Sequence, residues 1–160
     1  MGLGNFQEKT LSDSVKTMLA DAQERARQRG VRYRGDITPQ EAWAVAQSDS
    51  SAVLVDIRSM AECDLVGGVP GALEIEFREY PNWNLNPSFM AEVRALLKPE
   101  QTILLLCRSS VRTVEAGEML ADAGYEHVYN VLEGFEGALN AEGKRAVNGW
   151  KLAGLPWRQG

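Results

Sequence analysis

The feature that most constrains the fold is an apolar run, Ile103 to Leu106, which stops at Cys107. Such a run is typical of a buried strand in a parallel sheet. A short loop follows the cysteine, and from Thr113 the apolar residues recur at helical spacing. A buried strand that passes through a tight loop into a helix predicts an α/β fold, with Cys107 at the carboxyl end of a strand.

The loop after Cys107 combines several features that attract an anion. Ligands of open α/β sheets bind at the carboxyl ends of strands, where loop N–H groups and the next helix dipole favour negative charge. Arg108 and Arg112 add two positive charges close to the cysteine. This field favours the thiolate, which is the nucleophilic form, so we interpret Cys107 as reactive. The alternative is a small buried hydrophobic residue, which is the commoner role of a lone cysteine.

Three blocks of sequence carry a resemblance to a known family. The loop Cys-Arg-Ser-Ser-Val-Arg-Thr at 107–113 resembles the active-site loop of single-domain rhodaneses, which are sulfurtransferases. Residues 56–72 are similar to the family signature Asp-x-Arg…Glu…Gly-His-Ile-Pro-Gly-Ala, except that Gly68 stands where histidine is usual. Residues 124–135 resemble the closing strand and glycine turn of the family. The resemblance covers about residues 36 to 158.

The fold implied is α/β and rhodanese-like, with about five parallel strands and helices on both faces. We expect strands at 33–34, 52–56, 72–75, 103–106 and 127–131, and a closing helical segment from Leu132. Residues 33–160 would form the rhodanese-like domain. Residues 1–32 would form an amphipathic helical extension, with a helix at 10–29 that is capped by Thr10 and ended by Gly30.

The extension has an apolar face that must be buried, either against the domain or, as the alternative, in a dimer. Its tail carries a run of arginines, which we interpret as a solvated face; the alternative is a docking patch for an acidic partner. These residues are Arg25, Arg27, Arg29, Arg32 and Arg34.

The resemblance also implies roles for individual residues. Cys107 would be the nucleophile, and Asp56, Arg58 and Glu62 would be structural supports near the strand ends. The substrate anion or persulfide would be held by the loop that follows the cysteine, namely Arg108, Ser109, Ser110, Val111, Arg112 and Thr113.

The function implied is transfer of sulfane sulfur from thiosulfate or a persulfide donor, through a Cys107 persulfide, to a thiol, a protein partner or cyanide. One alternative is a sulfur-carrier or protein-interaction module with little turnover of small donors. Another is a cysteine phosphatase or arsenate reductase on the same fold. Those enzymes place five residues between cysteine and arginine, whereas four separate Cys107 from Arg112.

Composition argues against several other classes. The net charge of −5 does not suit a general nucleic-acid binder, which needs a strongly positive surface. No stretch approaches the roughly 18 apolar residues of a membrane span, and the N-terminus lacks the pattern of a signal peptide or a myristoylation site. We therefore expect a cytoplasmic protein, a monomer or weak dimer, with no membrane or nucleic-acid partner.

Neither a metal nor a cofactor is predicted. Cys63 and Cys107 are the only cysteines and His127 is the only histidine, which is too few for a ligand set, and no Gly-rich dinucleotide fingerprint follows a strand. Two cysteines suit a reducing cytoplasm better than a disulfide framework. Cys63 is interpreted as a core residue, and the alternative is a resolving thiol that pairs with oxidised Cys107. His127 precedes the last strand and is interpreted as surface or structural.

Overall fold

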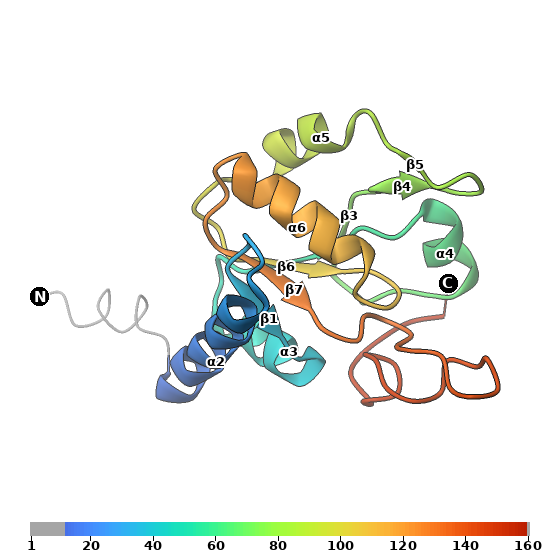
Figure 1. Cartoon of the computed structure of the whole chain (residues 1–160), viewed down its shortest axis with the longest axis horizontal. Helices are drawn as coiled ribbons and strands as arrows, with labels where there is room; N and C mark the ends of the chain where they lie inside the picture. The colour runs from blue at the N-terminus through green and yellow to red at the C-terminus, as the bar shows by residue number, and fades with distance from the viewer. Residues whose placement is uncertain (1–11, 160) are drawn as a thin grey trace, which may run out of the picture.

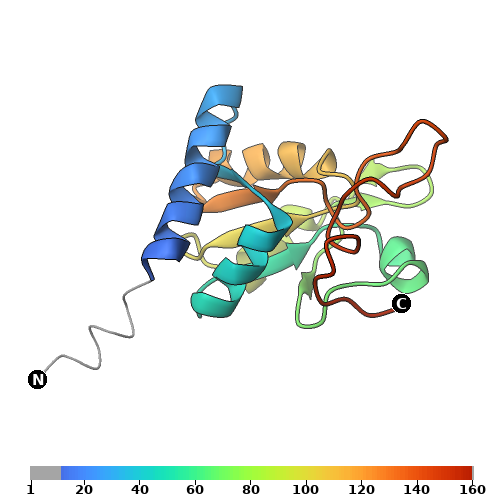
Figure 2. The same ribbon diagram turned by 90° about the horizontal axis from the view of Figure 1, so that it is seen from below.

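The computed structural model describes residues 12–159, which fold around a five-stranded parallel sheet (Figures 1 and 2). The strand order is β1-β7-β6-β2-β3, so β6 lies at the centre. All four neighbouring pairs are parallel, which brings the carboxyl ends of the strands to one edge of the sheet. The strands are β1 (Gly35–Ile37), β2 (Val53–Asp56), β3 (Leu73–Glu74), β6 (Ile103–Leu106) and β7 (Val128–Val131).

Helices cover both faces of this sheet, as expected. In Figure 1, α5 and α6 lie over one face and α2 and α3 over the other. The residues of β6 point alternately into the two cores, with Ile103 and Leu105 on the α6 side and Leu104 and Leu106 on the α2 side. The helices are α2 (Asp13–Arg29), α3 (Pro39–Ser48), α4 (Met60–Leu65), α5 (Phe89–Leu96) and α6 (Arg112–Asp122).

Helix α2 packs back on the domain through the buried residues Val15, Ala22 and Ala26. Gly30 ends it in the left-handed conformation, as predicted. The expected start was wrong, because Ser12 is the N-cap and accepts a hydrogen bond from the N–H of Val15. Thr10 lies outside the described residues.

Local side-chain contacts define the starts of the next helices. Thr38 and Ser59 form capping boxes at the starts of α3 and α4, with Glu41 and Glu62 as their partners. Helix α5 begins after Ser88, and the Asn86 side chain accepts the N–H of Ser88 in a turn before the helix.

Two other expectations were wrong. The first strand begins at Gly35 rather than Tyr33, because Tyr33 turns into the core and its hydroxyl donates to Asp36. The segment after β7 forms turns, not a helix: Glu133, Gly134 and Gly137 all have positive φ. This tail still packs inward through Trp150, which is fully buried, and it lies beside the sheet in Figure 2.

Two further features complete the fold. A small antiparallel pair, β4 (Arg78–Glu79) and β5 (Asn84–Leu85), projects between β3 and α5. Within the described part of the chain, no helix is both long and apolar enough to cross a bilayer.

Candidate functional site

Cys107 follows β6 directly, at the carboxyl edge of the sheet and in its centre. The side chain is buried, with 1% of its surface exposed. Its Sγ lies 3.5 Å from Oγ1 of Thr113, in the first turn of α6. The sequence predicted this strand, loop and helix, and the structure places the thiol under the loop 108–111 that joins β6 to α6.

The loop 108–111 offers its backbone N–H groups to a ligand. Among residues 12–159, these four N–H groups have no protein acceptor. Ser110 adopts a left-handed conformation, with φ of 71°, which bends the loop around the end of the strand. Free N–H groups in a bent loop before a helix form a concave site for an anion.

A turn after β7 supports this loop from the other side. The N–H of Phe135 donates to the carbonyl of Cys107 at 2.7 Å, and the N–H of Glu136 donates to that of Arg108 at 2.9 Å. Gly134 approaches so closely that a Cβ there would lie 2.5 Å from backbone atoms of Arg108. With a φ of 72° as well, position 134 therefore requires glycine.

A cavity of about 280 Å³ lies on the outer side of the loop. Nε of Arg108 is buried and has no hydrogen-bond partner among the described residues, so this guanidinium retains a donor for an anion. Trp83, which lies between β4 and β5, also lines the cavity. The lining residues are Arg78, Trp83, Arg108, Ser109, Val111 and Arg112.

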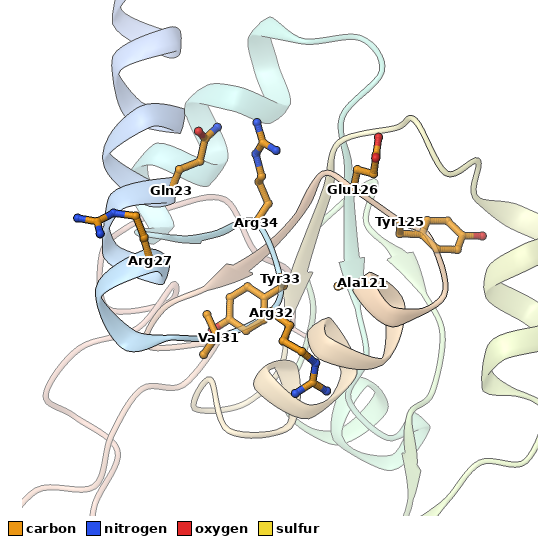
Figure 3. Close-up of a pocket in the computed structure, with 9 residues that line it drawn as sticks. All are labelled: Gln23, Arg27, Val31, Arg32, Tyr33, Arg34, Ala121, Tyr125 and Glu126. Carbon is orange, nitrogen blue, oxygen red and sulfur yellow. The ribbon is translucent and has the colours of Figure 1, made fainter.

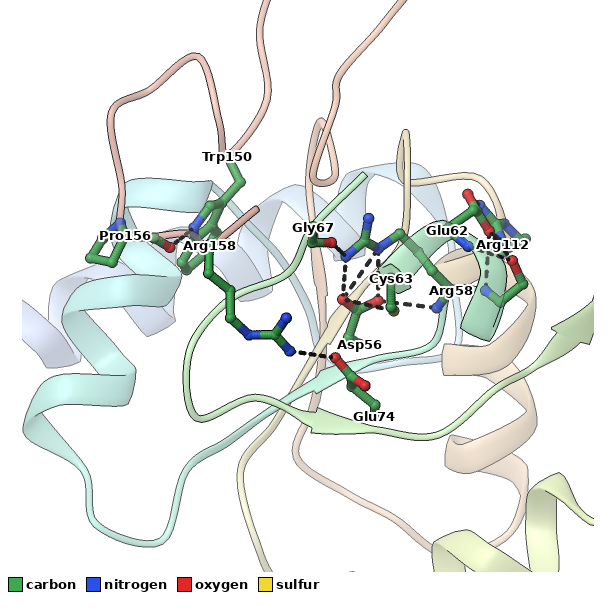
Figure 4. Close-up of polar contacts among 11 residues, drawn as sticks. Asp56, Arg58, Glu62, Cys63, Gly67, Glu74, Arg112, Trp150, Pro156 and Arg158 are labelled. Carbon is green, nitrogen blue, oxygen red and sulfur yellow. Dashed lines mark hydrogen bonds and ion pairs between the residues drawn. The ribbon is translucent and has the colours of Figure 1, made fainter. Parts of the chain in front are cut away.

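Arg112 is held by a carboxylate. Its two terminal nitrogens donate to both oxygens of Glu62 at 2.7 and 2.9 Å (Figure 4), and its guanidinium lies 5.0 Å from the centre of the Trp83 ring. Burial alone would raise the pKa of Glu62, but the hydrogen bonds and charge of Arg112, together with hydrogen bonds from Ser59, outweigh it and hold that pKa below its usual value. Glu62 therefore fixes the cation beside the loop.

Asp56 and Arg58 form a second, fully buried pair at the end of β2 (Figure 4). Arg58 donates to Asp56 Oδ2 at 2.7 Å and to the carbonyl of Gly67 at 2.6 Å. The guanidinium also stacks on Phe135, 4.2 Å from the ring centre. These contacts tie the loop after β2 to the turn that supports Cys107.

Cys63 lies on the far side of that pair. Its Sγ is 3.8 Å from Asp56 Oδ2, and burial together with the charge of Asp56 raises the pKa of its thiol to about 12. Such a thiol is a poor nucleophile at neutral pH, which argues against a resolving role. Ligand atoms of Asp56, Cys63 and Glu74 lie within 4.8 Å of one another, but Arg58 already provides the cation for Asp56, which does not suit a metal.

The expected histidine position is filled in another way. Gly68 forms a β-bridge with Arg158 of the tail, whose guanidinium donates to Glu74 at 3.3 Å (Figure 4). A Cβ on Gly68 would lie 3.6 Å from that guanidinium. The tail thus supplies a polar side chain next to the position where the family signature has histidine.

The hydroxyls of the loop are oriented by a residue that the sequence did not single out. Ser110 Oγ donates to Oδ1 of Asn130 on β7 at 3.0 Å, and Thr113 Oγ1 donates to the same oxygen at 2.5 Å. The only available signal was a polar residue within an apolar strand, which is unusual because buried polar groups need partners.

A larger cavity, of about 440 Å³, lies between α2 and α6 (Figure 3). Arg27, Arg32 and Arg34 line it and are exposed, as expected of a solvated face, although most arginines of this run are also paired with acidic residues. Arg27 pairs with Glu24, and Arg32 pairs with Glu118 and Asp122. Their charges are therefore largely neutralised. His127 immediately precedes β7, at the opposite edge of the sheet from Cys107.

A family model for the rhodanese-like domain matches residues 38–141. The chain belongs to the rhodanese-like domain family. The matched residues include β2, β6, α6 and β7, and therefore the whole Cys107 loop with the turn that supports it.

Known relatives agree with this assignment. An uncharacterized protein of Rickettsia rickettsii is 32% identical over 125 residues, which are 77% of this chain and 96% of that protein. The thiosulfate sulfurtransferase GlpE of Glaesserella parasuis is 31% identical over 107 residues, 67% of this chain and 88% of that protein. The crystal structure of Rv0390 from M. tuberculosis superimposes with a TM-score of 0.73 at 41% identity, covering 80% of this chain and 99% of that one.

Proposed function

We propose that this protein is a sulfurtransferase that carries sulfane sulfur as a persulfide on Cys107. The observation that carries the proposal is the loop 108–111, which directly follows Cys107 and whose N–H groups have no acceptor among residues 12–159. The unpartnered Nε of Arg108 adds a charged donor at the same place. Similarity to thiosulfate sulfurtransferases supports the same class of reaction.

The reaction requires two displacements at sulfur. The Cys107 thiolate attacks the outer sulfur of thiosulfate, the sulfur–sulfur bond of thiosulfate breaks, and the bonding electron pair leaves with sulfite. The loop N–H groups stabilise the negative terminal sulfur of the persulfide. An acceptor, a thiol or cyanide, then attacks that terminal sulfur, and the electron pair returns to Cys107 as thiolate.

The two arginines have different roles in this proposal. Arg108 keeps a free donor and binds the sulfonate or persulfide anion of the donor. Arg112 is already bound by Glu62 on two nitrogens, so it supplies positive potential and fixes the start of α6. Asp56 and Arg58 act as structural supports. We infer a cytoplasmic location, where both free cysteines stay reduced.

Intact-protein mass spectrometry of wild type and Cys107→Ser after brief exposure to thiosulfate tests the proposal. We expect wild type to gain one sulfur atom with release of sulfite, cyanide to reverse the gain, and the variant to show neither. A protein persulfide donor is tested next: transfer from that donor without thiosulfate turnover would indicate a sulfur carrier. Hydrolysis of a phosphate ester with no sulfur adduct would overturn the proposal.

A further inference from the structure

A chain of buried hydrogen bonds connects helix α2 with the Cys107 loop. At its centre stands Asn130 of β7, whose side chain is fully buried. Strand pairing places Asn130 beside Asp36 of β1 and beside Leu105 of β6, two residues before the cysteine. Its Nδ2 donates to Asp36 Oδ1 at 2.8 Å and lies 3.4 Å from the hydroxyl of Tyr33. None of these hydrogen bonds takes part directly in the proposed sulfur transfer.

The direction of each hydrogen bond follows from Asp36. Arg29 of α2 donates to Asp36 Oδ2 at 2.9 Å, and the Tyr33 hydroxyl donates to Oδ1 at 2.6 Å. Burial raises the pKa of Tyr33, which keeps its hydroxyl a donor. A carboxylate paired with arginine only accepts, so the Asn130 amide must turn its NH₂ toward Asp36 and its oxygen toward the loop.

This orientation determines what the loop hydroxyls do. Ser110 and Thr113 both donate their protons to the Asn130 oxygen. The bond to Ser110 holds the residue whose backbone is left-handed. The bond to Thr113 leaves only the lone pairs of that hydroxyl toward Cys107 Sγ, 3.5 Å away. The geometry of the loop therefore depends on the Asn130 amide, and Asp36, which lies outside the loop, determines the orientation of that amide.

We propose that Asn130 is a positioning residue for the Cys107 loop and that Asp36, held by Arg29 of α2, orients it. Measuring this role through the rate of sulfur transfer rests on the proposed function. The hydrogen bonds that join Arg29, Asp36, Asn130 and the loop do not depend on it. Helix α2, which precedes the residues matched by the family model, thereby contributes to the geometry of the reactive cysteine.

A swap of donor and acceptor tests the proposal. Asn130→Asp places two carboxylates against each other and removes the donor, and we expect Cys107 persulfidation at pH 7.5 to fall about 100-fold. Combining it with Asp36→Asn restores the complementarity, because the amide introduced at position 36 would donate to the carboxylate introduced at position 130. We expect the double variant to recover to within about tenfold of wild type.

The pH profile gives an independent readout. A protonated carboxyl at position 130 can donate to Asp36 and still accept from Thr113, so the defect of Asn130→Asp should shrink between pH 7.5 and 5.5. Apart from positions 36 and 130, the charged and titratable groups around the network are the same in wild type, Asn130→Asp and the double variant. They are Arg25, Arg29, Tyr33, Asp36, Cys107 and Arg112.

Thermal unfolding shows whether each variant is folded, and a third variant provides a test if Asn130→Asp is not. Arg29→Gln changes only the half-exposed outer end of the chain, and we expect about a threefold loss of rate. Folded Asn130→Asp with full rate, or a folded double variant no faster than the single one, would overturn the proposal. If Asn130→Asp does not fold, an unchanged rate in Arg29→Gln overturns it.

The failure of the proposed function would be visible separately, as wild type that forms no persulfide. The rate of Cys107 alkylation by iodoacetamide then replaces persulfidation as the readout in the same variants. The same order of rates would support the positioning role of Asn130, and equal rates would overturn it.

Discussion

The regions around Cys107 and Cys63 differ in charge rather than in burial. Both side chains are buried, with 1% and 5% of their surfaces exposed. Cys63 faces the carboxylate of Asp56, and the nearest cation, Arg58, is already neutralised by that carboxylate. Cys107 lies under N–H groups that have no acceptor among residues 12–159, beside Arg108, which has no acidic partner there. Both Arg108 and Arg58 keep one unpartnered nitrogen among these residues, but the charge of Arg58 is offset by Asp56. In the proposed function, the surrounding charges and donors, not accessibility, distinguish Cys107 from Cys63.

The largest difference between the two regions is expected when each cysteine is replaced in turn. We expect Cys107→Ser to lower sulfur transfer by about 10³-fold or more, since it removes the nucleophile. Cys63→Ser should stay within about twofold of wild type. Transfer to thiocyanate and alkylation mapped by mass spectrometry measure both. Alkylation of native Cys63 as fast as Cys107 would contradict the comparison.

The ion pair between Arg112 and Glu62 near Cys107 can be tested through the free energy of unfolding. Glu62→Gln leaves the largely buried guanidinium of Arg112 without a counter-charge, and we expect a loss of about 3 kcal/mol in the free energy of unfolding. The matched control is Glu115→Gln, which breaks the more exposed pair with Arg78 and should cost about 0.5 kcal/mol. Urea titrations measure both values. Equal losses would mean that Glu62 does not hold Arg112 in solution.

The same pair has a defined pH dependence. Arg112 holds the folded-state pKa of Glu62 below its unfolded value, so the stabilisation is fully present above about pH 4.3 and is lost as the pH falls through the lowered folded value. The difference in free energy of unfolding between wild type and Glu62→Gln should therefore shrink as the pH falls. Urea midpoints between pH 3 and 6 measure the difference, and a constant difference would contradict this assignment.

The smallest effect is expected near Cys63, at Gly68. Gly68 is buried, but a Cβ there would only come into ordinary van der Waals contact, with the nearest atoms at 3.5 to 3.7 Å, and it is not among the glycines with positive φ. Gly68→His should therefore fold and change sulfur transfer by less than about twofold, with Arg158 moving aside. Steady-state kinetics measure this change. A tenfold change would show that the Cys63 side of the molecule takes part in the chemistry.

Much of the fold could be predicted from local patterns. The run Ile103 to Leu106 and the glycine after α2 are each set by neighbouring residues, so the sequence alone indicated them. The turns after β7 could not be predicted in this way. Their conformation depends on contacts with Arg108 and Cys107, which are distant in sequence.

The candidate site likewise has a part that could be predicted from local sequence and a part that could not. The strand, loop and helix around Cys107 are continuous in sequence and were predicted together. The pairing of Arg112 with Glu62 joins residues that are 50 positions apart, and the contact of Asn130 with Asp36 spans 94. Such partners are chosen by strand order and register, which one sequence does not reveal. The arginines at the end of α2 are mostly exposed, as predicted, but the pairing of Arg25 with Glu41 and of Arg29 with Asp36 could not be predicted, for the same reason.

The support of the Cys107 loop by residues 134–137 has a consequence for biosynthesis. The ribosome releases the chain from the N-terminus, so the cysteine emerges well before the turn whose N–H groups bind the carbonyls of Cys107 and Arg108. A nascent chain that ends near Leu132 carries the thiol and its arginines without that brace. The loop around Cys107 therefore acquires its support only after residues 134–137 have been synthesised.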